Sequence, residues 1–224
     1  MKNLKRHILI LLLLCRINIF CQIDSVINLG GGHTDNVTSV AISSDGSKIA
    51  TGSNDYTAKL WDVNTGVEIR TLKGHTSYVT SVAISQDGSK IVTGSLDYTS
   101  KIWDANTGVE IRTLKGHTSG VTSVVISEDG SKIVTGSDKT VKIWDANTGV
   151  EIRTLNGHKS YIMSVAISQD GSKIVTGSGD STTKIWDANT GVEIQTLSGH
   201  KGVVTSVAIR VGIIQLRYGM QIRV

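Results

Sequence analysis

Short segments in which every second residue is apolar alternate with polar turns along most of this chain. A period of two is typical of β-strands with one buried face. Within residues 75–116, the turns at Asp87-Gly88 and Asn106-Thr107-Gly108 have the composition of tight hairpins. We therefore expect four consecutive antiparallel strands in this stretch, at residues 79–84, 90–94, 98–104 and 109–114.

The same four-strand unit recurs with a period of 42 residues, shortened once to 41. Each unit begins with Gly-His, and Trp-Asp follows about 28 residues later. A period of this length predicts an array of stacked repeats. The repeated residues are His33, His75, His117, His158 and His200 at one end and Trp61, Trp103, Trp144 and Trp186 at the other.

With Gly-His and Trp-Asp at these positions, residues 23–209 resemble the WD40 repeat family. The resemblance implies an all-β fold, a WD40-type β-propeller in which each repeat is one four-stranded blade. We expect an array over residues 22–209, with repeats at 33–74, 75–116, 117–157, 158–199 and a partial one at 200–209. Four complete blades and a partial fifth are fewer than the family's usual seven or so, so the ring is expected to be incomplete or open.

The resemblance also implies a hydrogen-bonded tetrad of His, Ser or Thr, Asp and Trp in each blade. A buried imidazole and a buried indole N–H both need partners, which a carboxylate and a hydroxyl can supply. The third set lacks the residue between Ser and Asp, so its turn is expected to differ. The four sets are His33, Ser53, Asp55 and Trp61; His75, Ser95, Asp97 and Trp103; His117, Ser137, Asp138 and Trp144; and His158, Ser178, Asp180 and Trp186.

Two enzymatic interpretations compete with a purely structural one. Ser, His and Asp together suggest a hydrolase, but they recur in several blades, whereas a catalytic site is normally single. The repeated WDANTGVEI segment is similar to quinoprotein dehydrogenase propellers, yet arginine or glutamine follows it where those enzymes carry tryptophan. We therefore predict a non-catalytic protein–protein interaction scaffold with no metal and no cofactor.

Positions that differ between nearly identical repeats indicate where a protein partner could bind. The resemblance places these positions on one rim of the propeller, where exposed tyrosines are effective interface anchors. Neutral drift of loop residues is the alternative explanation. The candidate partner surface is Asn36, Asn54, Tyr56, Tyr78, Leu96, Tyr98 and Tyr161.

The isoelectric point near 9.0 would suggest a nucleic-acid partner if the basic residues were spread over the repeats. Seven of them lie in residues 1–21 and 210–224, which contain no acid, so the repeat body is slightly acidic. We therefore expect protein partners and no nucleic acid.

The first 21 residues have the pattern of a secretory signal peptide. Basic residues precede an eight-residue apolar run at 8–15, which is too short to span a membrane. Both cysteines, Cys15 and Cys21, lie in this segment. The pattern predicts a secreted or periplasmic protein without disulfides and without a stable membrane span.

The repeat pattern stops after Ile209, and residues 210–224 form an aberrant tail. With allowed codons, the tail can be read in another frame as the expected repeat, so we expect a frameshifted copy. A short apolar stretch, 25–29, precedes the array and a single first strand, 203–209, follows it. Unpaired strand edges at both ends invite self-association. A homo-oligomer through open blade edges, in which two chains close one ring, and a truncated gene remnant are therefore alternative interpretations.

Overall fold

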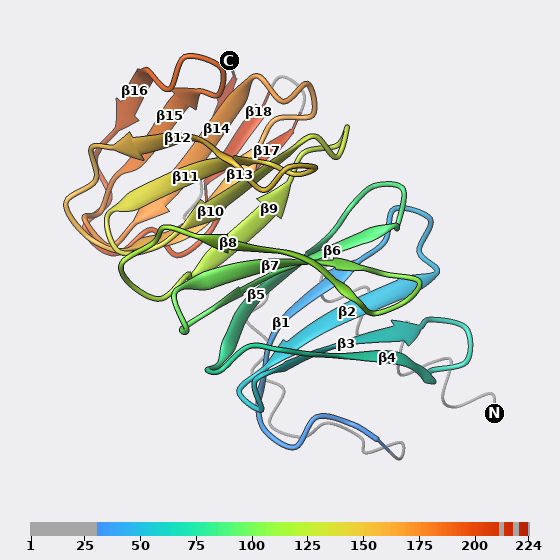
Figure 1. The fold of residues 1–224 in the computed structure, drawn as a ribbon. Helices are drawn as coiled ribbons and strands as arrows, with labels where there is room; N and C mark the ends of the chain where they lie inside the picture. The colour runs from blue at the N-terminus through green and yellow to red at the C-terminus, as the bar shows by residue number, and fades with distance from the viewer. Residues whose placement is uncertain (1–30, 211–212, 217–219, 224) are drawn as a thin grey trace.

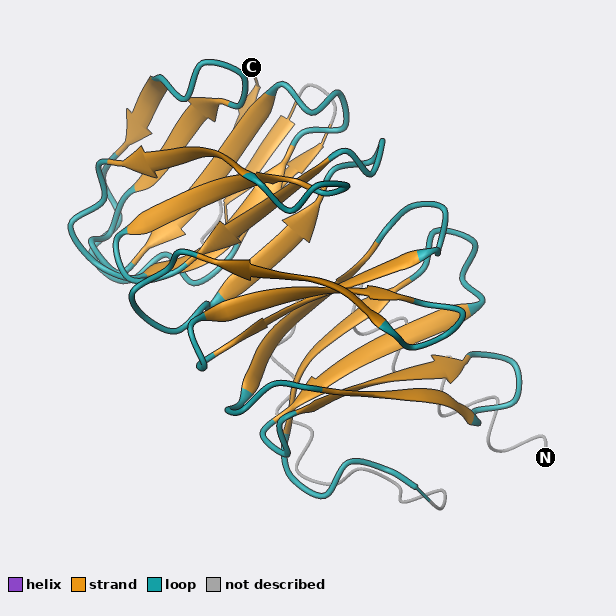
Figure 2. Cartoon of the chain, in the orientation of Figure 1, coloured by secondary structure: helices purple, strands orange, loops and turns teal. Residues whose placement is uncertain are grey.

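The computed structural model describes residues 31–210, 213–216 and 220–223, which form an all-β chain without a helix. Strands β1–β16 form four sheets of four (Figures 1 and 2). Their bounds are β1 Val37–Ile42, β2 Lys48–Ser53, β3 Thr57–Asp62, β4 Glu68–Lys73, β5 Val79–Ile84, β6 Lys90–Ser95, β7 Thr99–Asp104, β8 Glu110–Lys115, β9 Ser123–Ile126, β10 Lys132–Gly136, β11 Thr140–Asp145, β12 Glu151–Asn156, β13 Ile162–Ile167, β14 Lys173–Ser178, β15 Thr183–Asp187 and β16 Glu193–Leu197.

Each sheet is an antiparallel meander in which strands pair in chain order, and we call the sheets blades 1 to 4. The first strands of successive blades contact one another, so β1, β5, β9 and β13 line the inner side of the stack. The sheets follow one another in an open arc (Figure 1), with blade 1 at one end. The prediction of an open WD40-type array is confirmed.

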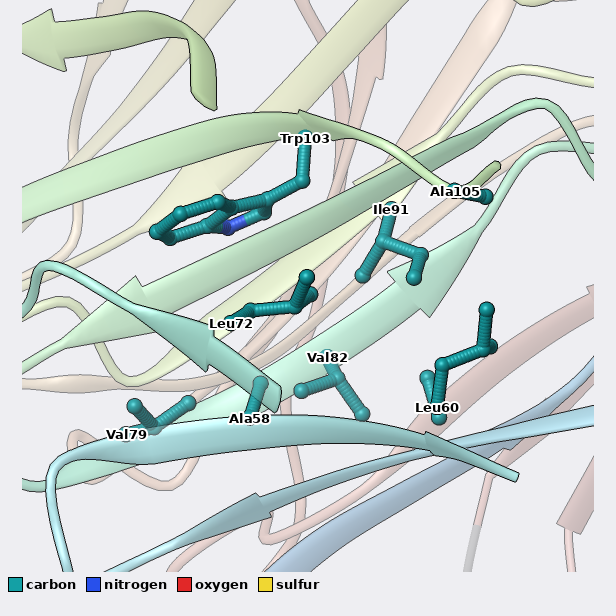
Figure 3. Close-up of a cluster of buried hydrophobic side chains, with 9 residues drawn as sticks. Ala58, Leu60, Leu72, Val79, Val82, Ile91, Trp103 and Ala105 are labelled. Carbon is teal, nitrogen blue, oxygen red and sulfur yellow. The ribbon is translucent and has the colours of Figure 1, made fainter. Parts of the chain in front are cut away.

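Apolar faces of neighbouring blades form the core. We call the face of a blade that points toward the next blade in the chain its back face, and the opposite face its front face. The back face of blade 1, with Leu60 and Leu72, packs against the front face of blade 2, where Val79, Ile91 and Trp103 are almost fully buried (Figure 3). Equivalent clusters join blades 2 to 3 and 3 to 4. Because each strand alternates between the two faces, one repeat supplies both halves of the interface.

Close approach of the blades explains why the second strand of each contains glycine. A Cβ on Gly52 would lie 2.7 Å from Val79 Cγ1 of the next blade, and one on Gly94 would lie 2.7 Å from Val121 Cγ1. Contacts this short do not occur for real side chains, so any larger residue would push the blades apart.

A fifth, partial sheet follows blade 4. It is three-stranded, in the order β17 Val207–Arg210, β18 Ile213–Leu216 and β19 Met220–Arg223. The inner strand β17 begins four residues later than the sequence predicts. The tail, expected to be aberrant, contributes two strands that continue the antiparallel sheet: β18 pairs with β17, and β19 pairs with β18.

The predicted signal peptide at 1–21 and the short apolar stretch at 25–29 lie outside the described residues. No helix in the described part of the chain has the length and apolar character needed to cross a membrane.

Candidate functional site

Each blade carries a buried hydrogen-bonded network around its histidine, and blade 2 shows the full arrangement. His75 Nδ1 lies 2.7 Å from Asp97 Oδ2, and His75 Nε2 lies 2.7 Å from Thr93 Oγ1. The indole Nε1–H of Trp103 donates to the same Thr93 oxygen at 2.9 Å. Blades 1 and 4 repeat this geometry.

The structure corrects the hydroxyl of the predicted tetrad. The partner of histidine and tryptophan is a threonine two residues before the predicted serine. Ser95 Oγ instead donates to the backbone carbonyl of Ser77 and accepts from the backbone N–H of Asp97, which shapes the turn. The threonines are Thr51, Thr93, Thr135 and Thr176, in place of Ser53, Ser95, Ser137 and Ser178.

Strand geometry explains the difference. Residues two apart on a strand share a face, so both hydroxyls satisfy the sequence pattern equally well. Register decides between them, because Trp103 pairs with Ile91 and Thr93 lies two residues further along the same face. The threonine is predictable from the sequence only if the register of β6 against β7 is known.

Partner chemistry fixes the direction of the hydrogen bonds. The carboxylate of Asp97 can only accept, so His75 carries its proton on Nδ1 and its Nε2 accepts from the Thr93 hydroxyl. Burial lowers the pKa of His75, and the bond to Asp97 offsets part of that effect. The neutral imidazole is therefore the form that fits this network.

Carboxylates in these networks are held ionised. Burial alone would raise the pKa of Asp55, but hydrogen bonds from Thr57, from His33 and from backbone N–H groups outweigh it and lower the pKa to about 2. Asp180 in blade 4 shows a shift in the same direction for the same reasons. Blades 2 and 4 therefore each contain an ionised aspartate beside a histidine whose pKa is lowered.

Blade 3 lacks the aspartate. His117 Nε2 still bonds Thr135 Oγ1 at 2.7 Å, and Trp144 still donates to Thr135 at 2.8 Å. His117 Nδ1 is buried and has no hydrogen-bond partner among the described residues. The missing residue before Asp138 shortens the turn, so that this carboxylate does not reach His117. Burial, with a contribution from Lys142, lowers the pKa of His117 to about 4.

An Asp–His–Thr chain resembles a catalytic relay, but its hydroxyl is unsuited to attack a substrate. Thr93, Thr135 and Thr176 are fully buried, and each oxygen already accepts a tryptophan N–H. Nucleophilic catalysis needs a hydroxyl that a substrate can reach. The networks therefore serve to stabilise the blades. Among the described residues, no cluster of His, Cys, Asp and Glu could hold a metal ion.

A second repeated network lies on the outer half of each blade and was missed in the sequence. In blade 2, Lys101 Nζ lies 2.8 Å from Glu110 Oε2 and 2.8 Å from Thr113 Oγ1. The other three blades repeat it. The alternation of Lys and Glu on neighbouring strands was visible in the sequence, but its register was not.

The predicted partner surface lies where the inner strands begin, in loops of successive blades, and we call this surface the rim. Two loops of each blade meet there, since Asn54 N–H donates to Asn36 O and Leu96 N–H donates to Tyr78 O. The rings of Tyr56 and Tyr78 lie 5.7 Å apart, which links blades 1 and 2. Most of the predicted residues are exposed, and only Asn54 is half-buried: Tyr56, Tyr78, Leu96, Tyr98, Tyr161 and Asn36.

Two of these tyrosines have an unusual backbone conformation. Tyr56 has φ 69° and Tyr98 has φ 70°, and Ser181 occupies the same turn position in blade 4 with φ 65°. Bulky residues rarely adopt this left-handed conformation, for which glycine is preferred. More than half of the Tyr98 surface is nevertheless exposed. The turn therefore holds a strained residue whose side chain is directed to solvent.

A groove of about 640 Å³ runs across the inner strands at their other end. Isoleucines at one repeat position line it, with polar residues from the turn after each inner strand beside them. In the sequence these isoleucines are indistinguishable from core residues, because they also fit the apolar alternation of a buried strand. They are Ile42, Ile84, Ile126, Ile167 and Ile209.

The stacked four-stranded blades and their buried networks define a repeat protein of the β-propeller type. Residues 25–62, 66–104, 108–145 and 149–187 match the family described as WD domain, G-beta repeat. These segments cover more than half of the chain, which therefore belongs to the WD40 repeat family. WD40 repeats generally form non-catalytic scaffolds that bind other proteins.

A single repeat length also matches a curated protein. Over 42 residues the chain is 48% identical to the U3 small nucleolar RNA-associated protein 15 homolog of Xenopus laevis. That alignment covers 19% of this chain and 8% of the relative, so the chain matches only a small part of that protein's length.

This comparison corrects the predicted location. The relative is named for a nucleolar RNA, which points to the nucleus, so the prediction of a secreted or periplasmic protein is wrong. That prediction depended on residues 1–21, where basic residues before a short apolar run are a compositional signal that does not by itself specify export. The expectation of no nucleic acid also fits poorly with the relative's name.

Proposed function

We propose that this chain is a non-catalytic scaffold that binds a protein partner through the rim. The observation that carries the proposal is the strained backbone of Tyr56 and Tyr98. A residue that costs folding free energy in a turn and contributes little to the core is retained for a reason outside the core. Binding supplies that reason, because tyrosine offers a large contact area and loses little rotamer entropy.

The shape of the rim favours a protein over a small molecule. Tyr56, Tyr78 and Leu96 follow one another across two blades, and Leu96 continues the strip onto blade 3 by covering Gly120. Such a strip presents several separate anchors without enclosing a ligand. We infer that the partner lays an extended or convex surface along blades 1 to 3.

The relative's association with a small nucleolar RNA is compatible with this role. A scaffold can join an RNA-containing particle through a protein partner, and the repeat body carries no excess of basic residues. The proposal is therefore a protein contact at the rim, with RNA contact as the outcome that would overturn it.

Photo-cross-linking tests the proposal. A photoreactive phenylalanine analogue would replace Tyr98 in one variant and Val109, an exposed residue of the same blade, in a control. After irradiation in the native cells, we expect a discrete protein adduct from position 98 that is absent from position 109. Identical adducts from both positions, or a nuclease-sensitive adduct from position 98, would contradict the proposal.

A further inference from the structure

Every junction between blades uses the same inner-strand hydrogen bonds. Ser39 Oγ accepts from Val82 N–H at 3.1 Å, and Ser164 Oγ accepts from Val207 N–H at 3.2 Å. The two junctions between them are alike. The threonine preceding each serine in blades 1 to 3 also donates to a carbonyl of the next blade. At every junction, therefore, a serine hydroxyl on one blade accepts a hydrogen bond from a valine backbone N–H on the next blade.

The two ends of the array carry the two halves of this junction. At the blade 1 end, Val40 is 47% exposed, whereas its counterpart Val82 is 6% exposed beneath blade 1. Trp61 is half-buried, whereas Trp103 is buried. This front face therefore has the composition of faces that are covered elsewhere in the chain.

At the other end, β17 and the residues before it repeat the back-face elements. Thr205 is exposed, and Ser206 and Ala208 are half-buried. They occupy the same repeat positions as Thr38, Ser39 and Ala41, which in blade 1 contact blade 2. The fifth sheet therefore has a hydroxyl donor in Thr205, a hydroxyl acceptor in Ser206 and a small apolar residue in Ala208, as blade 1 has at its junction with blade 2.

We propose that the front face of blade 1 binds the back face of the partial fifth sheet of a second copy of this chain, head to tail. The contact would continue the junction found four times within the chain, with Ser206 of one copy accepting from Val40 N–H of the other. Two front faces fit each other poorly, because both present the large residues that elsewhere meet alanine and leucine. This inference does not depend on the rim.

A head-to-tail contact between different faces has a definite consequence. It is heterologous, so copies either close into a ring or continue as an open string. Both assemblies have a mass that rises with concentration, and both bury the exposed apolar face of blade 1.

Light scattering of the full chain over roughly a hundred-fold range of concentration is the first test. We expect wild type to reach at least twice the monomer mass. Val40→Asp is expected to remain monomeric, because it places a charge in the contact. Val67→Asp makes the same change at an exposed turn of blade 1 and is expected to behave as wild type. A wild-type monomer at every concentration, or a Val40→Asp assembly equal to wild type, would overturn the proposal.

Mixing two variants tests the direction of the contact. Val40→Asp loses the front face, and Ala208→Asp loses the back face, so each alone is expected to be monomeric. Their mixture is expected to form a heterodimer, because each supplies the face that the other lacks. If Ala208→Asp alone still dimerises, the contact joins two front faces and the head-to-tail proposal is wrong. Circular dichroism of both variants checks that each is folded.

Discussion

At the scale of single residues, one threonine hydroxyl in each blade organises the network, and it is buried in blades 2 to 4. Thr93 accepts from Trp103 and donates to His75, so two groups that have left water are satisfied by one oxygen. In blades 1, 2 and 4 the structure brings together the predicted histidine and aspartate, but in blade 3 Asp138 does not reach His117. In all four blades the hydroxyl lies two residues before the predicted serine. Strand periodicity gives the face of a residue but does not give its neighbours on the next strand.

Removing this hydroxyl is expected to be costly. Thr93→Val keeps the shape of the side chain but leaves His75 Nε2 and Trp103 Nε1 buried without partners. We expect the free energy of unfolding to fall by about 2 to 4 kcal/mol. Urea denaturation measures the loss, and an unchanged midpoint would show that the network does not stabilise the blade.

The same substitution at Thr183 is expected to raise the free energy of unfolding instead of lowering it. Thr183 is fully buried, and its hydroxyl has no partner among the described residues. Valine already occupies the equivalent position in blade 3, at Val141. Thr183→Val is expected to raise the free energy of unfolding by about 1 kcal/mol. A loss similar to that of Thr93→Val would instead indicate a hidden hydrogen bond at this site.

His117 is expected to make stability depend on pH in a defined window. Its pKa is about 4 in the folded chain, against 6.5 when unfolded. The unfolded chain therefore binds the proton first, so stability falls as pH drops from 6.5 toward 4, by up to about 3 kcal/mol. His75 and His158, whose pKa values are also lowered, act in the same direction.

The variant His117→Gln isolates this contribution. Glutamine does not titrate, so its urea midpoints are expected to change less with pH than those of wild type across the same window. If the urea midpoints of both proteins change equally with pH, groups other than His117 cause the pH dependence. Carboxylates with lowered pKa values, such as Asp55 and Glu68, also reduce stability below about pH 5. Both proteins contain them, so the difference in pH dependence between wild type and His117→Gln reports on His117.

At the scale of elements, the strands of the repeat were predictable and the turns were less so. The sequence placed the first strand of blade 2 at residues 79–84, as observed, because alternation and flanking turn residues define it. Tyr98 was assigned to a strand, whereas it occupies a left-handed position in the turn before β7. A tyrosine there contradicts local preference, so only the structure could reveal it.

The length of the turn after β10 in blade 3 is expected to decide whether His117 gains a carboxylate partner. Inserting leucine between Ser137 and Asp138 restores the spacing of blade 2 and brings the carboxylate to His117 Nδ1. We expect the free energy of unfolding to rise by about 1 to 2 kcal/mol. The pKa of His117, followed by NMR, is expected to rise as well.

A leucine inserted after Asn147, in the turn between β11 and β12, is the matched control. It lengthens a turn of the same blade without supplying a partner for His117. If both insertions change stability and the pKa of His117 alike, the missing aspartate is not the cause of the perturbed histidine.

At the scale of the whole molecule, near-identical repeats made the architecture predictable. Each repeat carries both halves of the blade junction, so the period alone specifies a stack. What the period could not give is the behaviour of the ends. The fifth sheet gains two strands from a tail that breaks the repeat, and blade 1 presents a face that matches the covered ones.

The rim gives the whole molecule its proposed role, and its tyrosines connect stability with binding. A strained residue kept for binding should be replaceable by glycine with a gain in stability and a loss of function. Tyr98→Gly and Ser181→Gly remove the same left-handed strain, but only the first removes an exposed aromatic anchor. The pair therefore separates backbone strain from recognition.

The most direct test of the account compares these two variants for both properties. Urea denaturation is expected to show each more stable than wild type by up to about 1 kcal/mol. Quantitative mass spectrometry of proteins co-purified from the native cells is expected to show partners retained by wild type and Ser181→Gly and lost from Tyr98→Gly. If Tyr98→Gly retains the same proteins in the same amounts, the rim tyrosines do not form the binding surface.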